Sequence, residues 1–102
     1  MELRHLRYFC MVARELNFTR AAEKLNTVQP SLSQQIKDLE QEVGVKLLER
    51  SNRKVELIEA GEVFLKEALQ SLEHAERAIQ LARQVAEVEK EHLDIGFVPV
   101  AE

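Results

Sequence analysis

A chain of 102 residues, 45% of them hydrophobic, can form one small hydrophobic core and little more. Its net charge of −4 argues against a nucleic-acid partner, but that number hides two unlike halves. Residues 1–58 carry ten Lys and Arg against eight Asp and Glu, a net of +2, whereas residues 59–102 carry four against ten, a net of −6.

The single cysteine, Cys10, excludes an internal disulfide, and we expect it to be a small core residue and not a nucleophile. The charged start of the chain, Met1 to Arg7, is unlike a signal peptide. No apolar run is long enough to cross a bilayer. We therefore expect a soluble cytoplasmic protein without a membrane partner.

Two helices are predicted at the N-terminus. The spacing of apolar residues predicts an amphipathic helix over residues 2–16 and a short second helix over residues 19–25. Thr19 or Asn17 can cap the second helix, and Phe18, just outside it, can pack back onto the core.

A longer helix is predicted over residues 30–43, because Pro30 suits a first helical position and Gly44 a helix end. Its apolar stripe recurs at steps of four, three and four: Leu32, Ile36, Leu39 and Val43. The other face carries hydrogen-bonding groups and one positive charge, without an acid: Pro30, Ser33, Gln34, Lys37 and Gln41.

A short helix, a tight turn and a longer amphipathic helix together predict a helix-turn-helix. An acid-free face on the second of these helices suits entry into the DNA major groove, where Gln and Ser can contact base edges and backbone N–H groups can hold phosphate. The alternative is a surface helix with a solvated polar face.

The stretch over residues 45–58 predicts a β-hairpin, because two short apolar runs flank a polar loop. Four basic residues lie on or beside it: Lys46, Arg50, Arg53 and Lys54. A basic hairpin directly after a helix-turn-helix is typical of a wing, which can place an Arg in the minor groove or against phosphate. The alternative is an ordinary solvated hairpin.

Residues 59–91 predict one helix of roughly 50 Å. Large residues and alanines alternate along it on a seven-residue repeat that includes Leu65, Ala68, Leu72, Ala75, Ile79 and Ala82. Because so long a helix cannot bury its stripe on so small a domain, we expect it to pair with a second copy. The alternative, packing over its own domain, fits only the first turns, Val63 to Leu69.

The last stretch, residues 92–102, changes to the alternating pattern of a strand. A single strand does not make a sheet. We therefore expect an N-terminal fragment with three parts: a winged helix-turn-helix domain over 1–58, a linker and dimerisation helix over 59–91, and the start of a truncated domain over 92–102.

This order of motifs resembles the N-terminal part of LysR-type transcriptional regulators over essentially all 102 residues. The resemblance is carried by Met1 to Phe9, Phe18 to Leu25, Gln29 to Ile36, Leu39-Glu40, Gly44, Leu47 to Arg50 and Ala60-Gly61. The ending, Leu93 to Gly96, looks like the first strand of the family's effector-binding domain, and the opening residues are most similar to regulators of aromatic-acid catabolism.

The resemblance implies a mainly α fold and a homodimer, formed through the linker helix, that binds an interrupted palindrome in double-stranded DNA. It implies a tetramer for the full-length protein and a small-molecule effector only in the missing C-terminal domain. By position, the implied DNA contacts are Thr19, Gln29, Pro30, Ser33, Gln34, Gln35, Arg50 and Arg53. The family often has Arg where this chain has Gln34, and Thr where it has Glu59, so the base contacted and the cap of the linker helix are expected to differ.

Two other classes of function compete with this interpretation. A winged-helix module for protein–protein contacts would share the fold, but it has no need of Arg50, Arg53 and Lys54 clustered beside an acid-poor helix start. An enzyme is least favoured, because the sequence has no Gly-rich loop, nucleophile elbow or paired-carboxylate site. No cofactor or metal is expected either, since metal-ligand spacing is absent among His5, His74 and His92.

Overall fold

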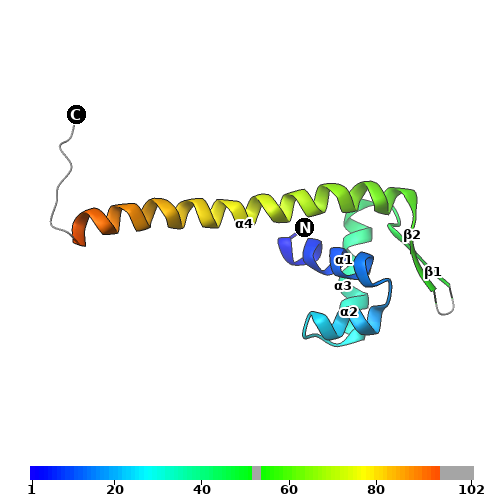
Figure 1. The fold of residues 1–102 in the computed structure, drawn as a ribbon. Helices are drawn as coiled ribbons and strands as arrows, with labels where there is room; N and C mark the ends of the chain where they lie inside the picture. The colour runs from blue at the N-terminus through cyan, green and yellow to red at the C-terminus, as the bar shows by residue number, and fades with distance from the viewer. Residues whose placement is uncertain (52–53, 95–102) are drawn as a thin grey trace. The chain divides into compact units, whose positions relative to one another are not determined.

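The computed structural model describes residues 1–51 and 54–94 of the chain (Figure 1). Its elements, in chain order, are α1 (Leu3–Glu15), α2 (Phe18–Lys24), α3 (Gln29–Val43), β1 (Leu48–Ser51), β2 (Lys54–Leu57) and α4 (Glu59–Asp94). This is the predicted mainly α fold, with a two-stranded antiparallel wing between the helix-turn-helix and a long final helix. One compact unit comprises Met1–Leu72, and a second begins at Glu73.

The turn between α1 and α2 is fixed by two adjacent residues. Leu16 ends α1 in the left-handed conformation, with φ of 51°, and its N–H donates to the Val12 carbonyl at 2.7 Å. Asn17 then caps α2, because its side-chain oxygen accepts from the Arg20 N–H at 2.8 Å. Of the two predicted caps the structure uses Asn17, so α2 begins at Phe18 and Thr19 is free for another role.

The third helix begins one residue earlier than predicted, at Gln29, with Pro30 in its first turn and extended Val28 as the N-cap. It ends as predicted at Gly44, where φ is 91° and the N–H donates to the Glu40 carbonyl at 2.8 Å. Glycine is favoured at such a left-handed position because it has no Cβ to clash with the backbone.

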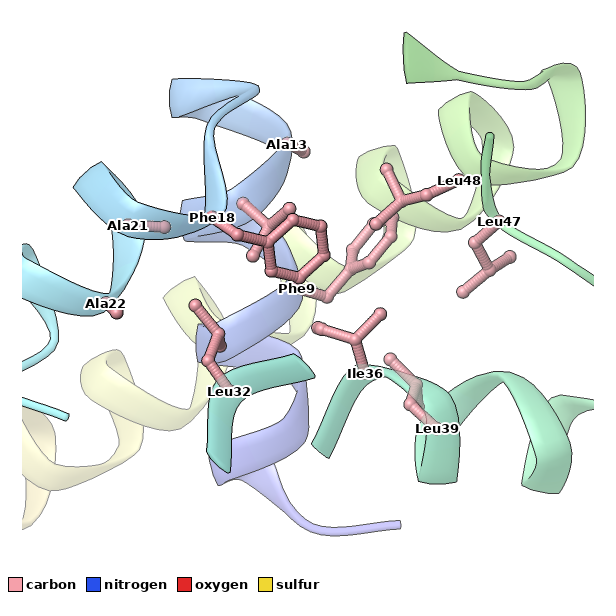
Figure 2. Close-up of a cluster of buried hydrophobic side chains, with 11 residues drawn as sticks. Phe9, Ala13, Phe18, Ala21, Ala22, Leu32, Ile36, Leu39, Leu47 and Leu48 are labelled. Atoms are coloured by element: carbon pink, nitrogen blue, oxygen red, sulfur yellow. The ribbon is translucent and has the colours of Figure 1, made fainter. Parts of the chain in front are cut away.

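A hydrophobic core joins the three N-terminal helices to the base of the wing. Figure 2 shows Phe18 and Ile36 gathered near Phe9, and the cluster includes Leu32, Leu39, Leu47 and Leu48. Ala21 and Ala22 are buried here as well, so α2 approaches its neighbours closely. Three residues of the predicted α3 stripe are fully buried, but Val43, in the last turn, is exposed.

The carboxylate of Glu40 connects α3 to the wing. One of its oxygens accepts the backbone N–H groups of both Leu47 and Leu48, at 2.8 and 3.0 Å. The two strands then pair in register from Leu48 opposite Leu57 to Ser51 opposite Lys54. The hairpin predicted over residues 45–58 is confirmed, and each of its strands is four residues long.

The first turns of α4 belong to the N-terminal unit. The Phe9 and Phe64 rings meet edge to face, with centroids 5.3 Å apart. Gly61 lies against the Leu47 carbonyl so closely that a Cβ there would stand 2.0 Å from its oxygen. Ala68 is only 3% exposed, and Leu65 packs against the core. Both residues were predicted to lie in the dimer seam, but the structure packs them on their own domain, which is the alternative stated for the first turns, Val63 to Leu69.

The second unit contains the rest of α4, which reaches Asp94 and so extends three residues past the predicted end. From Glu73 to Glu91 every side chain is exposed except Ala75, which is half-buried. The predicted strand falls largely on residues 95–102, which lie outside the described part of the chain. Among the described helices, none is both long and apolar enough to cross a membrane.

Candidate nucleic-acid interface

The predicted DNA contacts come from three segments of the N-terminal unit: the start of α2, the first turns of α3 and the hairpin. These segments enclose a shallow hollow of about 280 Å³ whose lining includes Thr19, Gln29, Arg50 and Lys54. All four residues are exposed, and two of them carry a positive charge. Residues that lie far apart in the sequence therefore contribute polar and cationic groups to one concave surface.

Arg50 is the residue that ties this surface together. Its Nη1 donates to the Ser33 hydroxyl of α3 at 2.7 Å, and its guanidinium carbon lies 3.9 Å from the centroid of the Phe18 ring. The stack on Phe18 is a cation–π contact. Burial lowers the pKa of Arg50, while the negative charge of Glu40 acts in the opposite direction. An arginine keeps its charge under such a shift, so a fixed cation stands between the hairpin and α3.

On the outer face of α3, Gln34 lies opposite the buried stripe. Its Nε2 donates to the Asp38 carboxylate, one turn further along, at 3.0 Å. Gln34, Asp38 and the adjacent Lys37 are all exposed. The outer face thus carries an oriented amide and one acid, where only neutral and basic groups were predicted.

The predicted contact residues divide into four groups. The structure brings Thr19, Gln29, Ser33 and Arg50 to the hollow or its edge, while Pro30 and Gln34 are exposed along the start and outer face of α3. Gln35 differs: it is half-buried, and its Oε1 is enclosed without a hydrogen-bond partner among the described residues. Arg53 lies outside the described residues.

Sequence reasoning did not predict two parts of this surface, the Phe18 platform beneath Arg50 and the Asp38 partner of Gln34. The first depends on tertiary packing and left no signal in the sequence. The second was available, because residues four apart on a helix are neighbours and Gln–Asp is a known hydrogen-bonding pair at that spacing.

Other chemistry has little support in the residues that the structure describes. No group of three His, Cys, Asp or Glu side chains among them is placed to hold a metal ion. The Cys10 thiol is half-buried, and burial raises its pKa, which disfavours a reactive thiolate.

The arrangement of α1, α2, α3 and a two-stranded hairpin defines a winged helix-turn-helix domain. Residues 3–62 match the family of bacterial regulatory helix-turn-helix proteins of the lysR type. Because the match covers more than half of the chain, the chain belongs to the LysR family, a family of transcription regulators and not of enzymes.

Relatives with known roles and structures share this domain. The chain is 63% identical over 102 residues to the Hca operon transcriptional activator HcaR of Escherichia coli K12, covering 100% of this chain and 34% of HcaR. It thus spans about a third of the length of that relative. It is also similar to the BenM DNA-binding domain crystallised with benA site 1 DNA, with a TM-score of 0.81 and 44% identity over 84% of this chain and 97% of that one. A CbnR DNA-binding domain in complex with DNA gives a TM-score of 0.81 and 44% identity over 84% and 99% of the two chains.

Proposed function

We propose that this chain binds double-stranded DNA through the start of α3 and the wing, as the N-terminal part of a dimeric transcription regulator. The observation that carries the proposal is Arg50, which stacks on Phe18 and donates to Ser33 at 2.7 Å. This contact fixes the wing against the helix that would enter the major groove, so that both elements meet DNA as one rigid surface. The similar BenM and CbnR domains, solved with DNA, support the same assignment.

The proposed DNA contacts are those that the family resemblance implies. Some of these residues have further support from their position in the structure, and others do not. Thr19, Gln29, Ser33 and Arg50 are supported by their position around one hollow, and Pro30 and Gln34 by their exposure on α3. Arg53 and Gln35 rest on the resemblance alone. The hollow supplies positive charge for phosphate, and the exposed amides of Gln29 and Gln34 supply donors and acceptors for base edges.

Dimerisation is proposed to use the part of α4 beyond Leu72. Large apolar side chains there are 45–60% exposed, and no described element of the chain covers them: Ile79, Leu81, Val85 and Val88. This apolar surface is broader than the predicted seam of Leu72, Ala75, Ile79 and Ala82. A second copy of the helix is the proposed cover, which would place two DNA-binding domains on the two halves of an interrupted palindrome.

For the whole protein we propose a tetramer, an effector bound by the part of the protein beyond this chain, a cytoplasmic location and a role in aromatic-acid catabolism. The support for the catabolic role is the likeness of the opening residues to that subgroup. A location in the bacterial cytoplasm follows from the proposed DNA target.

The test of DNA binding compares Arg50→Ala with Lys66→Ala, which removes a cation from an exposed position on α4. Arg50→Ala is expected to weaken binding to a selected site by about 1–3 kcal/mol and to reduce the salt slope by about one. Lys66→Ala is expected to bind nearly as wild type. A wild-type chain with no salt-dependent DNA binding would favour the protein–protein module.

A further inference from the structure

The pair formed by Gln34 and Asp38 has a consequence for which base the protein selects. The Nε2 of Gln34 donates to Oδ1 of Asp38 at 3.0 Å, and both residues are exposed on α3, opposite its buried stripe. Asp38 makes no ion pair among the residues that the structure describes. Within residues 1–51 and 54–94 this amide is the one partner given for its carboxylate, on the face proposed to enter the major groove.

An ionised carboxylate only accepts hydrogen bonds, so it distinguishes the two ends of the Gln34 amide. The nitrogen can face Asp38, whereas a flipped amide would place its oxygen against a negative charge. The contact thus fixes which way the amide points before DNA arrives. After one N–H is used, Gln34 retains one N–H donor and one carbonyl acceptor.

One free donor beside one free acceptor matches adenine in the major groove, which presents the N7 acceptor and the N6 amino donor. Guanine presents two acceptors, cytosine a donor alone, and thymine an acceptor and a methyl group, so none of them satisfies both groups. We propose that Gln34, oriented by Asp38, selects adenine at one base pair of the binding site. In this proposal, which rests on the proposed DNA-binding function, Asp38 is a positioning residue that does not touch the base.

Asp38 should increase the preference for adenine, but it should lower the affinity for DNA of any sequence. The second effect arises because its negative charge repels nearby phosphates. Removing it should lower discrimination at one base pair while leaving affinity for random DNA unchanged or raised. A residue that merely stabilised the fold would lower both quantities together.

The experiment selects binding sites from a randomised DNA pool with the wild-type chain and then measures affinity for duplexes with each base at every selected position. Gln34→Ala identifies its position as the one where preference disappears. There the wild type is expected to favour adenine by about tenfold. Asp38→Ala should reduce that preference to less than about threefold, with equal or higher affinity for random DNA.

Two variants control for charge and geometry. Glu23→Ala removes an exposed carboxylate from α2 and should keep the full preference for adenine. Asp38→Asn keeps the shape of the side chain, but its amide can donate as well as accept and therefore no longer fixes the orientation of Gln34, so it should lose most of the preference. The inference is overturned if the base lost with Gln34→Ala is not adenine, or if Asp38→Ala keeps the full preference. A wild-type chain that selects no sequence contradicts the proposed function itself.

Discussion

The two parts of α4 use the same repeat of large residues and alanines in opposite ways. In the N-terminal unit Ala68 is 3% exposed and Leu65 packs against the core, so the repeat faces the domain's own core. In the second unit Ile79, on the same repeat, is 45% exposed. A heptad pattern therefore gives the period of an apolar stripe, but it does not say whether the stripe is covered by the same chain or by another.

The largest expected effect is a loss of stability of the N-terminal unit when a core residue is removed. Phe9→Ala should destabilise the N-terminal unit by about 4 kcal/mol, because a fully buried ring that contacts Phe64 leaves a cavity. Val85→Ala is the control in the second unit, where the side chain is 60% exposed, and it should leave the unfolding of the N-terminal unit nearly unchanged. Guanidinium denaturation at one protein concentration measures both. Equal losses in the two variants would contradict the division into two units.

The next largest effect is expected in the exposed part of α4, in the second unit. Ile79→Asp should abolish the proposed dimer, because an unpaired carboxylate buried in a helix seam costs about 3–5 kcal/mol. The N-terminal unit should stay folded, since position 79 lies outside it. Sedimentation measures the oligomer, and binding to full and half palindromes measures the loss of the second, intramolecular contact. A wild-type chain that sediments as a monomer while binding the palindrome fully would rule out this role for α4.

A smaller effect is expected where α4 crosses the base of the wing. Gly61→Ala should destabilise the fold by about 2–3 kcal/mol, because its Cβ would stand 2.0 Å from the Leu47 oxygen and the helix must move. Gly44→Ala is a matched control of a different kind: no atom lies within 4 Å of its Cβ, but φ is 91°. Its strain should cost about 1 kcal/mol. Thermal unfolding compares the stabilities of the two variants, and Gly61→Ala should be the less stable. If Gly44→Ala is less stable instead, α4 can shift over Leu47 at little cost.

The smallest effect concerns the Glu15–Lys24 ion pair, 2.9 Å long, within the N-terminal unit. The hydrogen bond from Lys24 lowers the pKa of Glu15, partial burial opposes this, and the charges of Lys24, Arg14 and Arg20 add to the lowering. A lowered pKa in the folded state stabilises the fold above the ordinary pKa of Glu, and this contribution disappears as pH falls through the lowered value. Glu15→Gln should therefore be less stable than wild type at neutral pH and approach it as pH falls below about 4. Denaturation midpoints measured over a range of pH test this, with Glu23→Gln, at an exposed position, as the control. If the difference in stability between wild type and Glu15→Gln stays the same at every pH, the ion pair is not the cause of that difference.

Local features of the fold were predictable from the sequence, because they depend on neighbours along the chain. The α3 stripe, the Gly44 end and the hairpin all follow from spacing and turn chemistry. The start of α3 was misplaced by one residue, since Gln29 can adopt helical geometry before Pro30. For Ala68 the sequence left two possibilities, the dimer seam and its own domain, because the repeat alone does not say which surface covers it, and the structure buries it on its own domain.

The candidate site was predicted in its residue types better than in their orientations. Arg50 was expected to contact DNA, but its stack on Phe18 and bond to Ser33 link three elements that only the folded chain brings together. Gln35 was assigned to the surface by the resemblance, and its partial burial follows from its place on the flank of α3.

The fixed position of Arg50 has a thermodynamic consequence for complex formation. Proteins that order a segment on binding DNA show a large negative heat-capacity change, because folding is coupled to association. Here the guanidinium, the wing base and α3 are joined by contacts that exist in the free chain. Calorimetry over a range of temperatures should therefore give a heat-capacity change that matches only the area buried between protein and DNA, as in the docking of two rigid bodies.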